Sequence, residues 1–189
     1  MEEIRSFIAL ELTPEIQEEL ARVQTRLKTT GADVKWVNPE GIHLTLKFLG
    51  EISPALLEEV KQILNALAPR HQCFELKITR LGAFPNEEHP RVIWVGTEPE
   101  KNRLTQIVQE LAEGLINLGF FKEKRPFAPH LTLGRVRSPH NREQLKQALQ
   151  TTSVEQKVMR VTAITLFKST LTPQGAIYQS LHKAPFLAV

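Results

Sequence analysis

Apolar residues recur at helical spacing in four segments of the chain. In the first segment, Ile16, Leu20, Val23 and Leu27 form one stripe, which is typical of a helix that packs on a core. A Ser or Thr followed by Pro supplies an N-cap and a first-turn proline. The predicted helices begin at Thr13-Pro14, Ser53-Pro54, near Pro99 and at Ser138-Pro139.

Between these helices, apolar and polar residues alternate with the period of a strand. Phe74, Leu76 and Ile78, for example, alternate with polar neighbours. The predicted strands cover residues 6–12, 74–79, 91–96, 158–167 and 176–182, with a turn at Pro173-Gln174-Gly175 between the last two. Strands and helices without strict alternation favour an α+β fold with antiparallel pairing.

The tetrapeptide His-Leu-Thr-Leu occurs twice, at residues 43–46 and 130–133. Composition alone gives such a repeat a probability on the order of 10⁻⁵ to 10⁻⁴. Each copy follows an amphipathic helix and precedes a Ser-Pro helix start and a pair of strands. We therefore predict one bilobal domain over residues 1–189. Its two pseudo-symmetric lobes would each be an antiparallel sheet flanked by helices, divided near residues 97–102, with terminal strands able to exchange between lobes.

Strand geometry places His43, Thr45 and Lys47 on one face and the leucines on the other. His130 and Thr132 share a face in the same way. One alternative is that these are the ordinary polar faces of half-exposed strands, where Thr is a good strand former. The repetition favours a site in the cleft between the lobes.

Two opposed histidines suit the hydrolysis of a phosphodiester. With an unperturbed pKa of about 6.5, one imidazole can act as a protonated acid and the other as a neutral base. The base would activate water, the acid would protonate the departing oxygen, and the threonine hydroxyls could hold the nonbridging oxygens. A cyclic phosphate suits this chemistry, because opening the ring relieves strain.

Composition and charge limit the cellular location and the kinds of partner that we expect. Cys73 is the single cysteine, so no intramolecular disulfide can form. The net charge of +3 is weak evidence for an anionic partner. The start of the sequence lacks the pattern of a signal peptide, and no apolar run is long enough for a membrane span. We therefore expect a cytoplasmic protein without a membrane partner. No phosphate-binding loop motif supports ligation driven by ATP.

The sequence resembles the RNA 2',3'-cyclic phosphodiesterases, also called 2'-5' RNA ligases, of the two-histidine phosphoesterase superfamily. Besides the two HLTL segments, the resemblance covers residues 5–9, 34–37, 47–51, 82–85, 91–96, 126–129, 134–135 and 169–178. It implies that His43 is the proton donor and that His130 is the acceptor that activates water. It also implies that Thr45 and Thr132 bind phosphate, and that Arg135 contacts phosphate.

Strict alternation places Arg135 on the face opposite His130, so this role requires a bulge or bend at Gly134. Lys47 has the expected face without such help and is a further candidate for substrate binding, although a solvated lysine is the alternative. Five aromatic residues could stack a base or simply pack: Trp36, Trp94, Phe48, Phe127 and Tyr178.

The leading hypothesis is therefore a phosphodiesterase that opens 2',3'-cyclic phosphate ends of RNA or small nucleotides to 2'-phosphates. We expect it to need no metal and no cofactor, to have no protein partner, and to catalyse the reverse 2'-5' ligation as a minor activity. Two alternatives stay open. One is a nucleotide- or RNA-binding module without physiological catalysis. The other is a phosphodiesterase for a different cyclic or 2'-5'-linked substrate.

Overall fold

The fold is α+β, with two antiparallel sheets and four α-helices in the residues that the computed structural model describes, 3–99, 102–124, 126–173 and 175–188. The helices are α1 (Pro14–Lys28), α2 (Pro54–Leu67), α3 (Arg103–Ile116) and α4 (Arg142–Thr151). The strands are β1 (Ile4–Leu10), β2 (Val34–Trp36), β3 (Leu44–Ile52), β4 (Phe74–Phe84), β5 (Val92–Pro99), β6 (His130–Val136), β7 (Val158–Val161), β8 (Ala163–Thr172) and β9 (Gly175–Pro185). The predicted fold class is confirmed.

Each sheet takes strands from distant parts of the chain. Sheet A has the order β3-β1-β8-β9, and sheet B has the order β2-β6-β5-β4-β7. The HLTL segments begin β3 in sheet A and β6 in sheet B. The two copies of the tetrapeptide therefore lie in different sheets.

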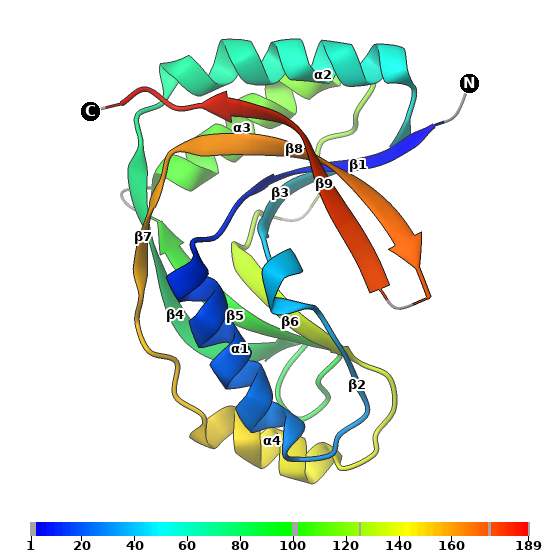
Figure 1. Ribbon diagram of the computed structural model, residues 1–189, viewed down its shortest axis with the longest axis vertical. Coiled ribbons are helices and arrows are strands. Elements are labelled where there is room, and N and C mark those ends of the chain that lie inside the picture. The colour runs from blue at the N-terminus through cyan, green and yellow to red at the C-terminus, as the bar shows by residue number, and fades with distance from the viewer. Residues whose placement is uncertain (1–2, 100–101, 125, 174, 189) are drawn as a thin grey trace.

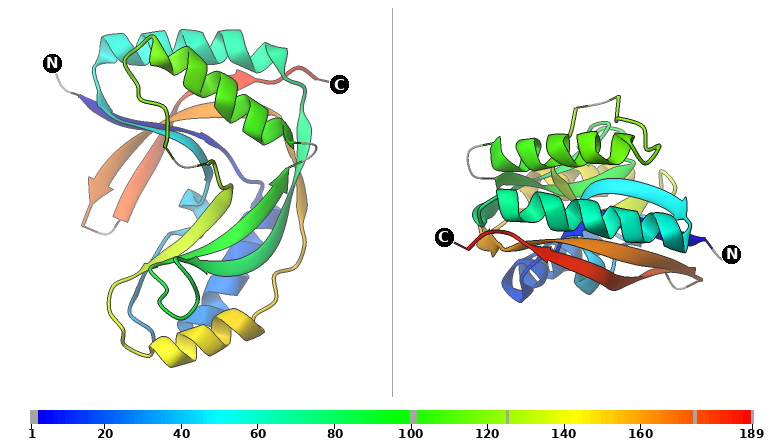
Figure 2. Two further views of the ribbon diagram at one scale, coloured as in Figure 1. Left: turned by 180° about the vertical axis from the view of Figure 1, so that it is seen from behind. Right: turned by 90° about the horizontal axis from the view of Figure 1, so that it is seen from above.

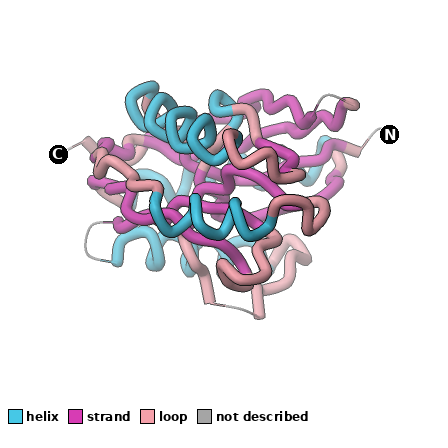
Figure 3. The backbone as a smooth tube through the Cα atoms, turned by 90° about the horizontal axis from the view of Figure 1, so that it is seen from below, coloured by secondary structure: helices cyan, strands magenta, loops and turns pink. Residues whose placement is uncertain are grey.

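The helices lie on the outer faces of the two sheets. Helices α2 and α3 cover sheet A, and α1 and α4 lie against sheet B at the other end of the molecule (Figure 1). The view from behind shows the same order of layers, and from below two helices lie in front of the strands (Figures 2 and 3). Among the described residues, no α-helix lies on the opposite face of either sheet, which we call the inner face (Figures 1 and 2). None of the described helices is both long and apolar enough to span a membrane.

The helix starts follow the sequence signals only in the first half of the chain. Helix α2 begins directly after Ser53, whose side-chain oxygen accepts a hydrogen bond from the Leu56 amide at 3.2 Å. Helix α4, in contrast, begins at Arg142 and not at Ser138-Pro139. Asn141 has a left-handed backbone conformation (φ 51°), and a right-handed helix that began at the proline could not continue through it. Helix α3 likewise begins after Asn102, at φ 59°.

The single strand predicted over residues 158–167 is wrong. The segment divides into β7, which pairs with β4 in sheet B, and β8, which pairs with β1 in sheet A. Val161 and Ala163 are both buried, so the alternation of the sequence continues across the change of sheet. Strands β8 and β9 form the predicted hairpin, although Gln174 of its turn lies outside the described residues.

Candidate active site

The two histidines make the same hydrogen bond. His43 Nδ1 lies 2.8 Å from the carbonyl oxygen of Gly41, and His130 Nδ1 lies 2.7 Å from that of Ala128. A carbonyl can only accept, so each Nδ1 carries a hydrogen. Each Nε2 is then the atom left for chemistry: it accepts a proton when the ring is neutral and donates one when the ring is charged.

Aromatic rings surround His43 on the inner face of sheet A. Phe7 stacks on the imidazole with ring centres 4.5 Å apart, and Tyr178 meets it edge-on at 4.9 Å. Burial lowers the pKa of His43, and the Gly41 carbonyl opposes this shift by stabilising the charged ring. In the free protein the neutral form of His43 is therefore favoured more than in an exposed histidine.

His130 is the first residue of β6 and is half-buried. The ring of Phe84, at the end of β4, meets its imidazole edge-on at 5.1 Å. Across the ladder His130 lies opposite Gly96 of β5, which places no side chain beside it. One side of His130 therefore faces an aromatic ring, and another side faces bare backbone.

The two HLTL segments lie close together although they belong to different sheets. Strand β3 contacts strand β6, and both Figure 1 and Figure 2 show them side by side where β3 begins. Burial raises the pKa of Tyr178, while the positive charges of Arg135 and Arg5 lower it. The positive charge of Arg135 in sheet B therefore acts on the tyrosine that contacts His43 in sheet A.

The threonines take the positions that the strand period predicts. Thr45 pairs with Ala9 of β1, and Thr132 pairs with Trp94 of β5. Both threonines are half-buried, and the leucines between and beyond them are buried in the core. Each hydroxyl thus lies on the inner face of its sheet, two residues from a histidine.

The bulge predicted at Gly134 is present. In the ladder between β5 and β6, Ile93 pairs with Gly134 but Trp94 pairs with Thr132, so Leu133 is the extra residue. This register shift turns Arg135 to the face of His130 and Thr132. Glycine is needed here because a Cβ atom would lie 2.7 Å from a methyl group of Val34 in β2.

A second bulge, in β3, overturns the expectation for Lys47. Ala9 pairs with Thr45 but Ile8 pairs with Lys47, so Leu46 is the extra residue and Lys47 points to the helix-covered face. Its Nζ donates hydrogen bonds to the carbonyl oxygen of Phe121 at 2.9 Å and to Glu123 at 2.7 Å. Lys47 therefore holds the segment after α3 and lies on the wrong face to bind substrate beside His43.

Phe48 takes the inner-face position instead. It pairs with Phe7, its ring lies 6.2 Å from the Phe7 ring, and it is 66% exposed. In both copies the bulge follows the threonine, so Phe48 after HLTL corresponds to Arg135 in the second copy. The two halves of the site thus present different chemistry at equivalent positions, a ring near His43 and a cation near His130.

The sequence did not single out Phe7 or Phe84 as site residues. Phe7 stands in a run of apolar residues, so both faces of β1 are apolar there. No alternation therefore marks the face that will contact a histidine. Phe84 lies between Ala83 and Pro85 at the end of its strand. Only the pairing of strands from distant parts of the chain shows that these rings touch the histidines.

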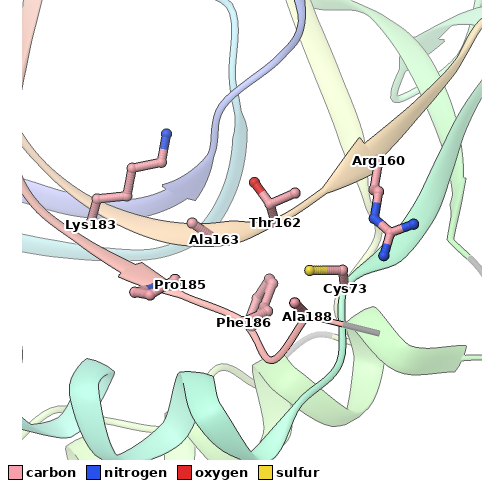
Figure 4. Close-up of a pocket in the computed structure, with 8 residues that line it drawn as sticks. All are labelled: Cys73, Arg160, Thr162, Ala163, Lys183, Pro185, Phe186 and Ala188. Carbon is pink, nitrogen blue, oxygen red and sulfur yellow. The ribbon is translucent and has the colours of Figure 1, made fainter.

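A separate hollow lies at the junction of β7 and β8 with the C-terminal segment (Figure 4). It is lined by Cys73, Arg160, Thr162, Ala163, Lys183, Pro185, Phe186 and Ala188. None of these residues belongs to an HLTL segment. Within the described ranges, no group of three or more His, Cys, Asp and Glu side chains is arranged to hold a metal ion.

Comparison with known proteins gives relatives over almost the whole chain. The RNA 2',3'-cyclic phosphodiesterase of Methanocaldococcus jannaschii is 41% identical over 177 residues, 93% of this chain and 97% of the relative. The protein of the same name from Methanothermobacter thermautotrophicus is 34% identical over 179 residues, 94% of this chain and 96% of the relative.

Solved structures agree with this relationship. The protein TT0787 of Thermus thermophilus superposes with a TM-score of 0.80 at 28% identity, covering 97% of this chain and 98% of that one. Escherichia coli LigT complexed with 3'-AMP gives 0.75 at 26% identity, covering 98% and 99%. The family described as LigT like Phosphoesterase matches twice, over residues 10–94 and 95–178. Each of these two matches contains one histidine of the pair. Because together they cover most of the chain, the chain belongs to the LigT-like phosphoesterase family.

Proposed function

We propose that this protein hydrolyses RNA 2',3'-cyclic phosphate ends to 2'-phosphomonoesters, with His43 as the proton donor and His130 as the proton acceptor. The observation that carries the proposal is the matched pair of imidazoles, each with Nδ1 fixed on a backbone carbonyl and Nε2 available. The names of the two archaeal relatives support the substrate class. Binding of 3'-AMP by the similar Escherichia coli protein supports a nucleotide ligand.

The reaction needs one proton removed and one supplied. His130 Nε2 takes a proton from water as the water oxygen bonds to phosphorus, and the bond from phosphorus to O3' breaks. His43 Nε2 gives its proton to O3', which leaves a 2'-phosphate and a free 3'-hydroxyl. With a 5'-hydroxyl in the place of water, the same groups acting in the same order would join a cyclic phosphate end to that hydroxyl through a 2'-5' linkage, which we propose as a minor activity.

Fixed groups on the inner faces supply the charge compensation. The hydroxyls of Thr45 and Thr132 can donate hydrogen bonds to the nonbridging oxygens, and the guanidinium of Arg135 adds a full positive charge on the same face. With protonated His43 these groups supply four donors around one phosphate. We therefore propose that catalysis proceeds without a metal ion.

The depressed pKa of His43 is compatible with its role as the acid. Desolvation disfavours its charged form in the free protein, and a nearby anion opposes this effect. A phosphodiester bound against Nε2 places a negative charge beside the ring, which raises the pKa of His43 and restores the proton that O3' needs. Substrate binding and protonation of His43 are then coupled, so the acid forms where the leaving oxygen lies.

In-line geometry fixes the direction of the nucleoside. The attacking and departing oxygens lie on opposite sides of phosphorus, so the ribose that carries O3' extends toward His43 and sheet A. Phe48 and Tyr178 lie on this side, and the exposed ring of Phe48 is suited to contact the terminal base.

The proposal is tested by incubating the protein with a nucleoside 2',3'-cyclic phosphate, and separately with a 2'-5'-linked dinucleotide, in excess chelator. We expect the cyclic phosphate to open at full rate to the 2'-phosphate, identified by phosphorus NMR. A 3'-phosphate product would contradict the proposed step, because O2' and not O3' would then have departed. Loss of activity in chelator, restored by Mg²⁺, would contradict the metal-free mechanism. Binding without turnover of either substrate would favour the binding module.

A pH profile tests the coupling at His43. Because burial lowers the pKa of His43, its protonated fraction in the free enzyme falls at lower pH than in an exposed histidine. We expect a bell-shaped kcat/KM, and a kcat whose alkaline limb lies at higher pH than that of kcat/KM, because bound phosphate raises the pKa of His43.

Tyr178→Ala provides the matched variant for this profile. Removing the ring that lies 4.9 Å from His43 admits water, so the pKa of His43 should rise and the alkaline limb of kcat/KM should move to higher pH. Proton NMR titration of His43 in the parent and in the variant measures the pKa directly. Identical alkaline limbs for kcat/KM and kcat in the parent would contradict the coupling.

A further inference from the structure

The inner face of sheet B carries an aromatic surface that the hydrolysis of a cyclic phosphate does not use. Trp94 of β5 pairs with Thr132 on one side and with Gly82 of β4 on the other, so its indole lies on the inner face. A Cβ atom on Gly82 would lie 2.5 Å from the indole, and one on Gly96 would lie 3.3 Å from it. Two glycines thus leave the space in which the tryptophan lies over the sheet.

This surface continues to His130 through ring contacts. The Phe84 ring lies 5.1 Å from the Trp94 ring and 5.1 Å from the His130 imidazole, and it is 37% exposed. On the indole, the guanidinium carbon of Arg80 lies 5.4 Å from the ring centre. We call Phe84, Trp94 and Arg80 the sheet B platform. It offers a ring next to His130 and a positive charge farther along the sheet.

The position of the platform relative to phosphorus decides what it can bind. In the proposed mechanism the ribose of the cyclic phosphate extends toward His43, and His130 directs the nucleophile on the other side. An attacking water molecule has no group that could stack on the aromatic ring of Phe84. A nucleoside whose 5'-hydroxyl takes the place of that water would extend from His130 over Phe84, where its base can stack.

We propose that the sheet B platform binds the 5'-terminal nucleoside of a second RNA, with the base on Phe84 and the following phosphate toward Arg80. This inference rests on the proposed function. In the forward step the 5'-oxygen bonds to phosphorus, its proton passes to His130, the bond to O3' breaks, and His43 protonates O3'. In the opposite direction a 3'-hydroxyl attacks the phosphorus of a 2'-5' linkage, its proton passes to His43, the bond to the 5'-oxygen breaks, and His130 returns a proton to that oxygen. No further reactant is needed in either direction.

The experiment compares a reaction with one nucleoside and a reaction with two. For the parent and for Phe84→Ala we would measure kcat/KM for opening of a nucleoside 2',3'-cyclic phosphate and for cleavage of a 2'-5'-linked dinucleotide. The ratio of ligated to hydrolysed product is then measured with a cyclic-phosphate donor and a 5'-hydroxyl acceptor RNA. We expect Phe84→Ala to lower dinucleotide cleavage and the ligation ratio roughly tenfold, as for loss of one stacked base. Opening of the cyclic mononucleotide loses only the contact between Phe84 and the His130 ring, so it should fall by no more than about threefold.

Two further variants separate stacking from packing on His130. Phe84→Leu keeps an apolar contact with the imidazole but removes the ring face, so it should resemble Phe84→Ala, whereas Phe84→Trp should retain both activities. Phe48→Ala, on the His43 side, should weaken both reactions together because both use the same terminal nucleoside. Thermal melting of each variant checks that it is folded.

Each result decides a different question. A selective loss in Phe84→Ala supports the inference, and an equal loss of both reactions overturns it, because Phe84 would then act only through His130. Hydrolysis by the parent with neither ligation nor 2'-5' cleavage also overturns the inference but leaves the proposed function standing. Failure of the parent to open a cyclic phosphate overturns the proposed function itself, and the inference with it.

Discussion

Replacing either His43 or His130 by alanine should lower kcat for opening a 2',3'-cyclic phosphate by about 10² to 10⁴. In the proposed mechanism each substitution removes a group that transfers a proton in the transition state. It removes ring contacts with Phe7 and Tyr178 in one case and with Phe84 in the other. Steady-state kinetics with the cyclic nucleotide, together with thermal melting curves, would measure the loss of rate and confirm that the variants are folded.

The leaving group separates the two roles. An aryl phosphodiester releases a phenolate that needs little protonation, so the loss in His43→Ala should shrink on this substrate while the loss in His130→Ala persists. The double variant should lower kcat little more than the more damaging single substitution does, because acid and base act in the same step. If the loss shrinks in His130→Ala instead, the roles are exchanged. If both variants turn over near the parental rate, this mechanism is wrong.

Local signals in the sequence were sufficient for the elements that depend on neighbours along the chain. The Ser-Pro start of α2 and the apolar stripe of α1 are properties of a few adjacent residues, and both helices lie where the sequence predicts them. The shared face of each histidine and its threonine follows from the period of a strand alone. Residues two apart point to the same side whichever strands flank them. The repeat then identified them as a pair.

The sequence carries no signal for features that depend on which strands pair in a sheet. Residues 158–167 show one continuous alternation, yet the chain passes from sheet B to sheet A near Thr162, because β4 and β1 provide the two partners. Phe84 becomes a site residue only because β4 and β6 both flank β5. A pattern read along one strand cannot show which strand will lie beside it.

The two bulges illustrate the same limit within one motif. Gly134 marked its bulge, because a glycine in a strand is a recognised signal for such a break. In the first copy Lys47 stands at the equivalent position, and lysine carries no such signal. Strict alternation therefore predicts Lys47 on the face of His43 and Phe48 on the face of the leucines, and both predictions are wrong.

Arg135 and Lys47 form a matched pair that tests this correction. Arg135→Met should lower kcat/KM for the cyclic phosphate by about 10- to 100-fold, the effect of losing a charged hydrogen bond to phosphate. Lys47→Met should leave kcat/KM within about threefold, because its ammonium group binds Phe121 and Glu123 on the other face of the sheet.

The control measurements follow from the contacts of Lys47 and from the chemistry of Arg135. Lys47→Met should change the free energy of unfolding by less than about 1 kcal/mol, since the Glu123 side chain is 72% exposed and water screens the pair. Arg135→Lys should restore only part of the rate, because an ammonium group cannot bind two phosphate oxygens as a planar guanidinium does. Urea unfolding and steady-state kinetics on the same four proteins would measure both quantities. A larger loss in Lys47→Met than in Arg135→Met would show that the bulge after Thr45 does not set the face on which substrate binds.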